Sequence, residues 1–195
     1  MTPTDTYIPS SPMDGFQGFQ VPETITPAQL GDTLARLVWE SFSDFMAEDD
    51  AEVSMTELGV TTEGGLPPSH LAEEALIFLM WAHTRGAQLA FVGRAEEQLI
   101  KGGLDSLHDA VFHDMVQQGT PPGQILLFEQ RVGARYAEYN QAAARSDAEL
   151  SRSALRHLTG EESGSPTKSM AILDRALAVA SPLKDFLEEV KLVDA

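Results

Sequence analysis

The sequence predicts an all-α protein: a bundle of about five or six helices around a long central helix, preceded by an extended N-terminal tail. Apolar residues recur at helical spacing in several long stretches, and no stretch alternates apolar and polar residues as a strand does. The run ALIFLMWA, residues 75 to 82, is apolar on every side. Other helices must enclose a helix of that kind, because a surface helix keeps one polar face.

The tail is expected over residues 1–25, because Pro and Gly are scattered there among Ser, Thr and Asp. Within it the repeat GFQGFQ places Phe16 and Phe19 three residues apart. These two side chains suit either a short docking motif for a partner or a strap over the protein's own core. Residues 26–195 are expected to form a single helical domain.

The first helix is predicted over residues 26–47, and its start is the clearest in the chain. Thr26 is the expected N-cap, Pro27 suits the first helical position, and Gln29 completes a capping box. Residues 48–68 are acidic and end in Gly-Gly-Leu-Pro-Pro, which predicts a solvated loop. Their carboxylates do not have the spacing of an EF-hand calcium loop.

The central helix is predicted over residues 69–101, from a serine N-cap to a stop signal at Gly102-Gly103. At about 1.5 Å per residue it would be roughly 45 to 50 Å long. A short helix over residues 104–118 is expected to follow and to end at a Gly- and Pro-rich turn. The last helix is predicted over residues 166–192.

The fourth helix is predicted over residues 124–158, a length of roughly 50 Å, whereas a domain of 195 residues has a diameter of about 33 to 43 Å. One end should therefore project, and its apolar residues predict a second chain that covers them. One side of this helix carries a basic stripe interleaved with Glu138 and Glu149. The arginines of the stripe are Arg131, Arg135, Arg145, Arg152 and Arg156.

The composition excludes several classes of protein. A formal net charge of -17 argues against a nucleic-acid-binding surface, because phosphate binding needs clustered Lys and Arg. The absence of Cys excludes disulfides, thiolate catalysis and Cys-ligated metals. The N-terminus lacks the basic and apolar regions of a secretory signal, and no stretch reaches the roughly 20 apolar residues of a membrane span. A cytoplasmic protein with no membrane partner is expected.

Two groups of residues are candidates for chemistry. Asp105 and His108 stand three apart on one helix edge, a spacing that helical bundles use for metal ligands. The two Glu-x-x-His motifs of such bundles are missing, so the alternative is a core histidine satisfied by one hydrogen bond. Arg85 shares a side with apolar residues and is expected to be enclosed, with a partner carboxylate from Asp109 or Glu129. It would either form a buried ion pair or grip an anionic ligand.

Two hypotheses about function follow. The first is a non-enzymatic helical interaction or assembly protein that self-associates, as a dimer, through its long helices or binds another protein. Its partner-binding residues would be Phe16, Phe19, Arg145, Arg152 and Arg156. The second is a ligand- or metal-binding helical bundle that uses Asp105, His108 and Arg85, and this hypothesis leaves enzymatic activity open. The sequence contains neither a nucleophile elbow nor a phosphate-binding loop, and no cofactor is expected.

Overall fold

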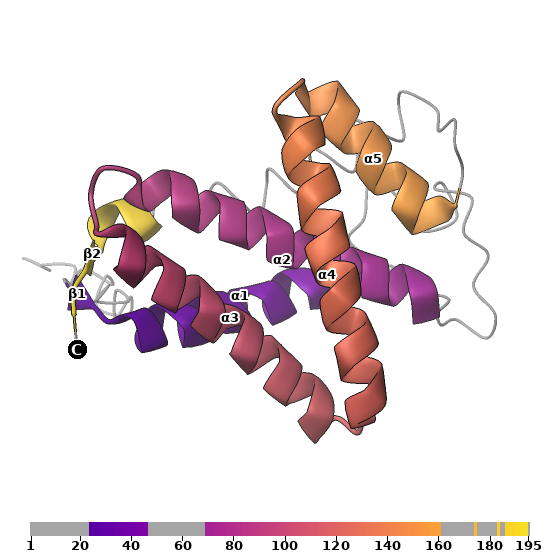
Figure 1. The fold of residues 1–195 in the computed structure, drawn as a ribbon, viewed down its shortest axis with the longest axis horizontal. Helices are drawn as coiled ribbons and strands as arrows, with labels where there is room; N and C mark the ends of the chain where they lie inside the picture. The colour runs from indigo at the N-terminus through magenta and orange to yellow at the C-terminus, as the bar shows by residue number, and fades with distance from the viewer. Residues whose placement is uncertain (1–23, 47–68, 161–173, 175–182, 184–185, 195) are drawn as a thin grey trace, which may run out of the picture.

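The computed structural model describes residues 24–46, 69–160, 174, 183 and 186–194. Figure 1 shows the helices of this part of the chain, and residues 174, 183 and 186–189 are also helical. The all-α prediction is confirmed. Phe16 and Phe19 lie outside the described residues, as does nearly all of the expected tail. The bounded helices are α1 (Pro27–Met46), α2 (Ser69–Phe91), α3 (Glu97–Gln117), α4 (Pro122–Ala143) and α5 (Asp147–Thr159).

The start of α1 forms the capping box that the sequence predicts. The backbone N–H of Thr26 donates to Gln29 Oε1 at 3.0 Å, and the backbone N–H of Gln29 donates to Thr26 Oγ1 at 3.3 Å. Two amide groups that the helix itself leaves unpaired are thereby satisfied. The predicted first helix, residues 26–47, therefore agrees with α1 to within one residue at each end.

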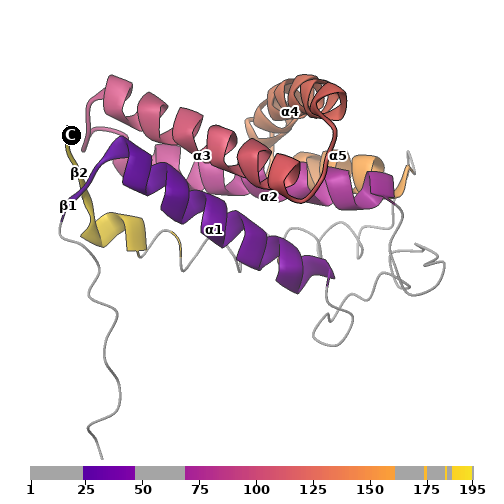
Figure 2. The same cartoon turned by 90° about the horizontal axis from the view of Figure 1, so that it is seen from below.

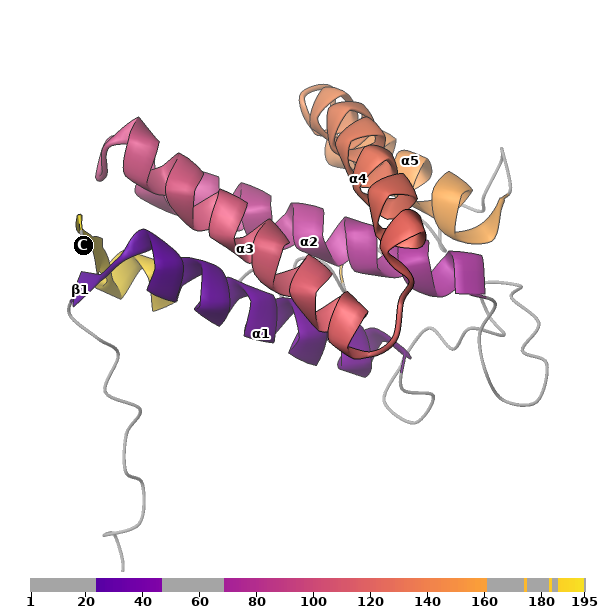
Figure 3. The same ribbon diagram turned by 60° about the horizontal axis from the view of Figure 1, so that its bottom comes forward.

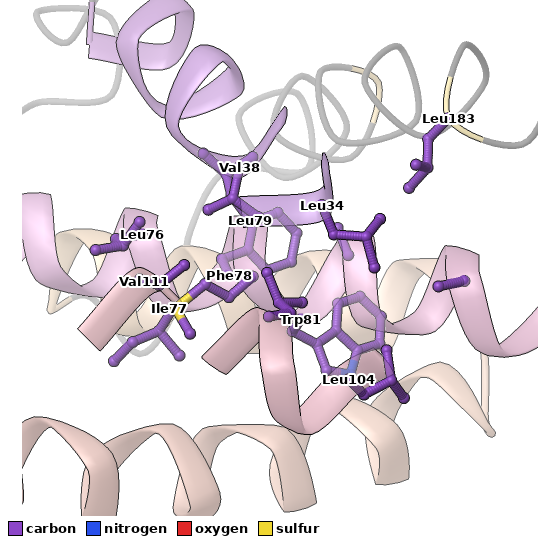
Figure 4. Packing of buried hydrophobic residues seen from close by; sticks show 14 of the residues in the cluster. Leu34, Val38, Leu76, Ile77, Phe78, Leu79, Trp81, Leu104, Val111 and Leu183 are labelled. Carbon is purple, nitrogen blue, oxygen red and sulfur yellow. The ribbon is translucent and has the colours of Figure 1, made fainter. Parts of the chain in front are cut away.

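α2 lies at the centre of the bundle and contacts α1, α3, α4 and α5. Every residue from Glu74 to Thr84 is buried, so the prediction that the apolar run is enclosed is confirmed. Figure 4 shows Leu34 and Val38 of α1, Phe78 and Trp81 of α2, and Leu104 of α3 within one cluster. This cluster also contains the C-terminal residues Leu183, Leu187 and Val190.

α1 and α3 pack along each other, as Figure 3 shows, and glycines permit their close approach. A Cβ atom at Gly31 would lie 2.3 Å from the Cβ of Ser106 and 2.7 Å from the backbone nitrogen of Leu107. A Cβ at Gly103 would lie 2.7 Å from the Cδ2 of Leu30. These glycines therefore serve helix packing, because any larger side chain would force the two helices apart.

The predicted central helix over 69–101 is wrong in its length, because α2 ends at Phe91. The chain reverses at Gly93, whose φ of 73° is a left-handed conformation that glycine adopts without steric cost. The predicted stop at Gly102-Gly103 is also wrong, since both residues lie inside α3. Gly103 has the packing role just described, so the glycine pair marks a helix contact and not a helix end.

The predicted fourth helix over 124–158 is likewise two helices. α4 ends at Ala143, and α5 begins at Asp147 after Ser146, whose side chain accepts a hydrogen bond from the backbone N–H of Glu149. α5 turns back onto α2 and α4 and buries Leu150, Leu155 and Leu158. The expected projecting end therefore does not exist, and its apolar residues are covered by the chain's own core.

The described C-terminal residues close the bundle beside α2. β1 (Thr24–Ile25) and β2 (Lys191–Leu192) pair in parallel, so residues 191 and 192 do not continue the helix predicted over 166–192. Arg94 lies at the turn between α2 and α3. Its guanidinium donates to four backbone carbonyls at 2.8 to 3.1 Å, those of Ala90, Leu187, Glu188 and Val190. Arg94 thus ties the end of α2 to the C-terminal segment.

Candidate interaction surface

An ion pair between the buried Glu74 and the partly buried Arg135 joins α4 to the centre of the bundle. Arg135 of α4 donates from Nε to Glu74 Oε2 at 2.8 Å and from Nη2 to Glu74 Oε1 at 3.0 Å. The Glu74 side chain is 7% exposed and the Arg135 side chain 21%. The hydrogen bonds to the Glu74 carboxylate raise the pKa of Arg135. The two-pronged geometry fixes the rotation of α4 about its own axis, because only one face of α4 can present Arg135 to α2.

The same network continues to α5 through Glu138. His157 Nε2 lies 2.6 Å from Glu138 Oε2, and Arg156 donates to the same oxygen at 3.2 Å. Burial alone would raise the pKa of the Glu138 carboxyl. The hydrogen bond from His157 and the positive charges of Arg135 and Arg156 outweigh this effect, so the pKa of Glu138 lies below its usual value. Glu138 therefore holds α5 against α4 as an ionised carboxylate.

Tyr136 connects α2, α3 and α4 inside the core. Its hydroxyl lies 3.0 Å from His108 Nε2 and 3.2 Å from Thr84 Oγ1, and His108 Nδ1 donates to the Leu104 carbonyl at 2.7 Å. With Nδ1 as a donor, a neutral His108 accepts from Tyr136, which in turn accepts from Thr84. Burial lowers the pKa of His108 and raises the pKa of Tyr136, which favours these neutral forms. Each element thus contributes one polar group to a single chain of hydrogen bonds.

The predicted metal residues are both engaged in other contacts. Asp105 accepts a hydrogen bond from Lys101 Nζ at 2.7 Å on the surface of α3. Both ring nitrogens of His108 face hydrogen-bond partners, so the alternative of a core histidine is the better description, with two bonds where one was expected. Among the residues that the structure describes, no three His, Asp or Glu side chains could together hold a metal ion.

Arg85 does not occupy the enclosed position that its helical side predicted. The residue is exposed on α2, and its neighbours His83 and Thr84 are buried. The buried arginine-carboxylate pair that the sequence led us to expect at Arg85 instead involves Arg135 and Glu74. The apolar residues on its own side of α2 do not determine whether Arg85 is enclosed, because burial depends on where the neighbouring helices pass.

The basic stripe divides between two helices. Arg131 pairs with Glu73 of α2, Arg152 pairs with Glu149, and Arg156 pairs with Glu138. All three ion pairs are formed within the chain. Arg145 lies at the turn between α4 and α5 and is exposed, and within the described part of the chain its guanidinium has no ion-pair partner. Of the three arginines predicted to bind a partner, Arg145 alone combines exposure with this lack of a described partner.

The side of α4 that points away from the bundle is uncharged and partly apolar. Figure 2 views α4 nearly end-on and shows it as the outermost helix on its side of the ribbon. Leu126 is 57% exposed and Leu127 is 60% exposed. We call this surface the α4 outer face and define it by its exposed residues on one helical sector. They are Leu126, Leu127, Gln130, Gly133, Ala134, Ala137 and Gln141.

The sequence analysis missed both the Glu74–Arg135 pair and the α4 outer face. Arg131 and Arg135 are one helical turn apart on α4, whereas their partners Glu73 and Glu74 are adjacent residues of α2. The two spacings differ, so no pattern in the sequence indicated that these arginines of α4 pair with α2. The α4 outer face follows from the break between α4 and α5, which the prediction of a single helix over residues 124–158 does not contain.

Comparison with known proteins adds no identification. No known protein family, curated protein or solved structure matches this chain. The fold and the surface therefore define only the class of protein: an all-helical protein in which one outer helix has an uncharged exposed face. Among the described residues, no helix combines the length and apolar character that crossing a bilayer requires.

Proposed function

We propose that this chain is a non-enzymatic helical interaction protein, as the first hypothesis from the sequence holds, and that the α4 outer face binds its partner. The observation that carries the proposal is the exposure of the adjacent Leu126 and Leu127 on a helix face without charge. Charged residues make up 22% of the chain, and an uncharged surface with apolar anchors is typical of the centre of a protein interface.

The polar groups of the interior support the same proposal. Two pairs of polar side chains satisfy each other across three helices: Glu74 with Arg135, and His108 with Tyr136. They hold helices together, and they offer no free nucleophile beside a general base. The alternative hypothesis of a ligand- or metal-binding bundle gains no specific support from Asp105, His108 or Arg85. That the protein is cytoplasmic and binds no nucleic acid stays a prediction from the sequence.

Site-specific photo-crosslinking in the source cells tests the proposal. A photoreactive phenylalanine analogue in place of Leu127 should give cross-linked adducts of defined mass. The same analogue in place of Gln98, an exposed residue of α3, is the matched control and should give none. Equal labelling at the two positions would contradict the proposal, because exposure alone would then explain the adducts. The absence of adducts at position 127 would also contradict it, because no partner would then contact the α4 outer face.

A further inference from the structure

We infer that the α4 outer face binds a second copy of this chain, with the two α4 helices antiparallel across a two-fold axis. This inference rests on the proposed function and names the partner that the surface fits. Three observations lead to it: a glycine without an internal role, a residue pattern that is complementary to itself, and the net charge of the chain.

Gly133 lies in the middle of α4, and nothing lies within 4 Å of the position that a Cβ atom would take there. Glycine in a helix interior destabilises the helix by about 1 kcal/mol relative to alanine. Gly31 and Gly103 show what this chain uses helical glycines for, since each permits another helix to approach closely. Gly133 also lies in the interior of a helix, but no described helix packs against it. A helix of another molecule would supply this neighbour.

Four of the seven residues of the α4 outer face form a pattern that is the same in both directions, and Gly133 of one copy lies opposite Glu138 of the other. If the two-fold axis passes between residues 135 and 136, Gln130 of one copy lies opposite Gln141 of the other. Ala134 then lies opposite Ala137, and the small side chains meet at the axis, where the helices must be closest. Leu127 lies opposite Ala144, just beyond the end of α4. A two-fold contact requires such a self-complementary surface, whereas an unrelated partner does not.

The charges around the face agree with this arrangement. On one flank, Arg131 of one copy approaches Glu138 of the other while each keeps its ion pairs within its own chain, and the symmetry repeats the contact. Both side chains are partly exposed, at 36% and 39%. Arg145, whose guanidinium lacks a described partner, lies beside Leu126 of the other copy. Two chains with a net charge of -17 repel each other, so an uncharged face with alternating charges at its edge is where they approach at least cost.

The size of the face places the contact in the class of small interfaces. The 22 residues of α4 span about 33 Å, and a strip about 10 Å wide gives roughly 300 Å² per chain. Two copies would then bury roughly 600 to 700 Å², below the ~1,200 Å² of a standard stable interface. The dimer is therefore a weak, reversible one, with a dissociation constant on the order of 10⁻⁵ to 10⁻³ M.

Cysteine cross-linking tests the geometry, since the chain contains no Cys of its own. In the antiparallel dimer, position 134 lies roughly 5 Å along the helix axis from position 134 of the other copy, and so does position 137 from its counterpart. The two copies of position 123 lie roughly 37 Å apart. A short bismaleimide should therefore cross-link A134C and A137C dimers, but not G123C. Cross-linking of all three would overturn the antiparallel arrangement, and cross-linking of none would overturn the dimer.

Sedimentation equilibrium of the full chain, over concentrations that bracket the expected dissociation constant, tests the partner itself. The wild type should change from monomer to dimer. Ala137→Arg brings two cations together at the axis and should raise the dissociation constant at least ~10-fold. Gln98→Arg adds the same charge on α3 and should leave it unchanged. Circular dichroism checks that both variants fold.

A wild type that stays monomeric overturns the inference. The photo-crosslinking result then decides separately about the proposed function. An adduct of a different protein at Leu127 would retain the interaction role with another partner. The absence of any such adduct would remove both.

Discussion

Arg135 donates two hydrogen bonds to the Glu74 carboxylate, and through this pair α4 is fixed on a central helix whose surroundings are otherwise almost entirely apolar. A charge in such a place is tolerated only with its partner, because an unpaired carboxylate loses its hydration without compensation. The pair decides which side of α4 faces inward. It therefore also decides that the uncharged side faces outward.

Arg135→Ala should destabilise the fold by about 3 to 5 kcal/mol, because it leaves the Glu74 carboxylate buried without a partner. Glu74→Leu combined with Arg135→Met removes both charges and should come within about 2 kcal/mol of the wild type. Urea unfolding measures both. If the double variant is no more stable than Arg135→Ala, the loss reflects packing around Arg135 and not an unpaired charge.

Tyr136 and Tyr139 should respond oppositely to removal of their hydroxyl groups. Tyr136→Phe leaves the partly buried His108 and the buried Thr84 without a shared partner and should cost about 1 to 3 kcal/mol. The Tyr139 hydroxyl is buried and has no hydrogen-bond partner among the described residues. Tyr139→Phe should accordingly be neutral or stabilising by up to about 1 kcal/mol. Each variant loses one hydroxyl oxygen and nothing else, so thermal unfolding compares them directly. Equal losses of stability would contradict the hydrogen-bond network.

The fold should lose stability as the pH falls from 6.5 to 5.5. Burial lowers the pKa of His83 and of His108 below their usual value of 6.5. Below that pH the unfolded chain binds protons that the folded chain does not, so protonation favours unfolding. Each histidine contributes a slope of up to about 1.4 kcal/mol per pH unit until its folded pKa is reached.

The slope is measured by urea unfolding at several pH values in this window. His83→Gln and His108→Gln should each reduce it, whatever they do to the stability at pH 7. His70→Gln, at an exposed position of α2, is the control and should leave it unchanged. The depressed pKa of Glu138 acts only below about pH 4.5, outside the window. A slope that survives both core substitutions would show that other groups produce it.

Gly31 and Gly133 provide a further pair of opposite predictions. At Gly31 a methyl group would meet the Cβ of Ser106 at 2.3 Å and the backbone of Leu107 at 2.7 Å. Gly31→Ala should therefore cost about 1 to 3 kcal/mol through the separation of α1 and α3. Gly133→Ala meets nothing within 4 Å and should stabilise the monomer by about 0.5 to 1 kcal/mol through helix propensity. Unfolding at a concentration below that of the dimer measures both, and a destabilised Gly133→Ala monomer would reveal a neighbour within the chain.

Sequence patterns that act within one helix were sufficient for much of the fold. The capping box of Thr26 and Gln29 and the apolar period of α1 determined that helix almost to the residue. The fully apolar run of α2 determined that other helices surround it. These features depend on contacts three or four residues apart, and for that reason a single sequence reports them directly.

The helix ends and the partners of polar groups were decided by tertiary structure. Gly93 and Gly103 are the same residue type, yet one ends α2 in a left-handed turn while the other lies inside α3 beneath Leu30. Glu74 and Arg135 are 61 residues apart in the chain, and no local pattern says which carboxylate an arginine will reach. The helix propensity of a glycine changes the free energy of folding by only about 1 kcal/mol. Burying an apolar face, or breaking a buried ion pair, changes it by several kcal/mol. The sequence therefore determined that this chain is helical and has an apolar centre, and the packing of its helices decided where they break and which face of α4 is left exposed.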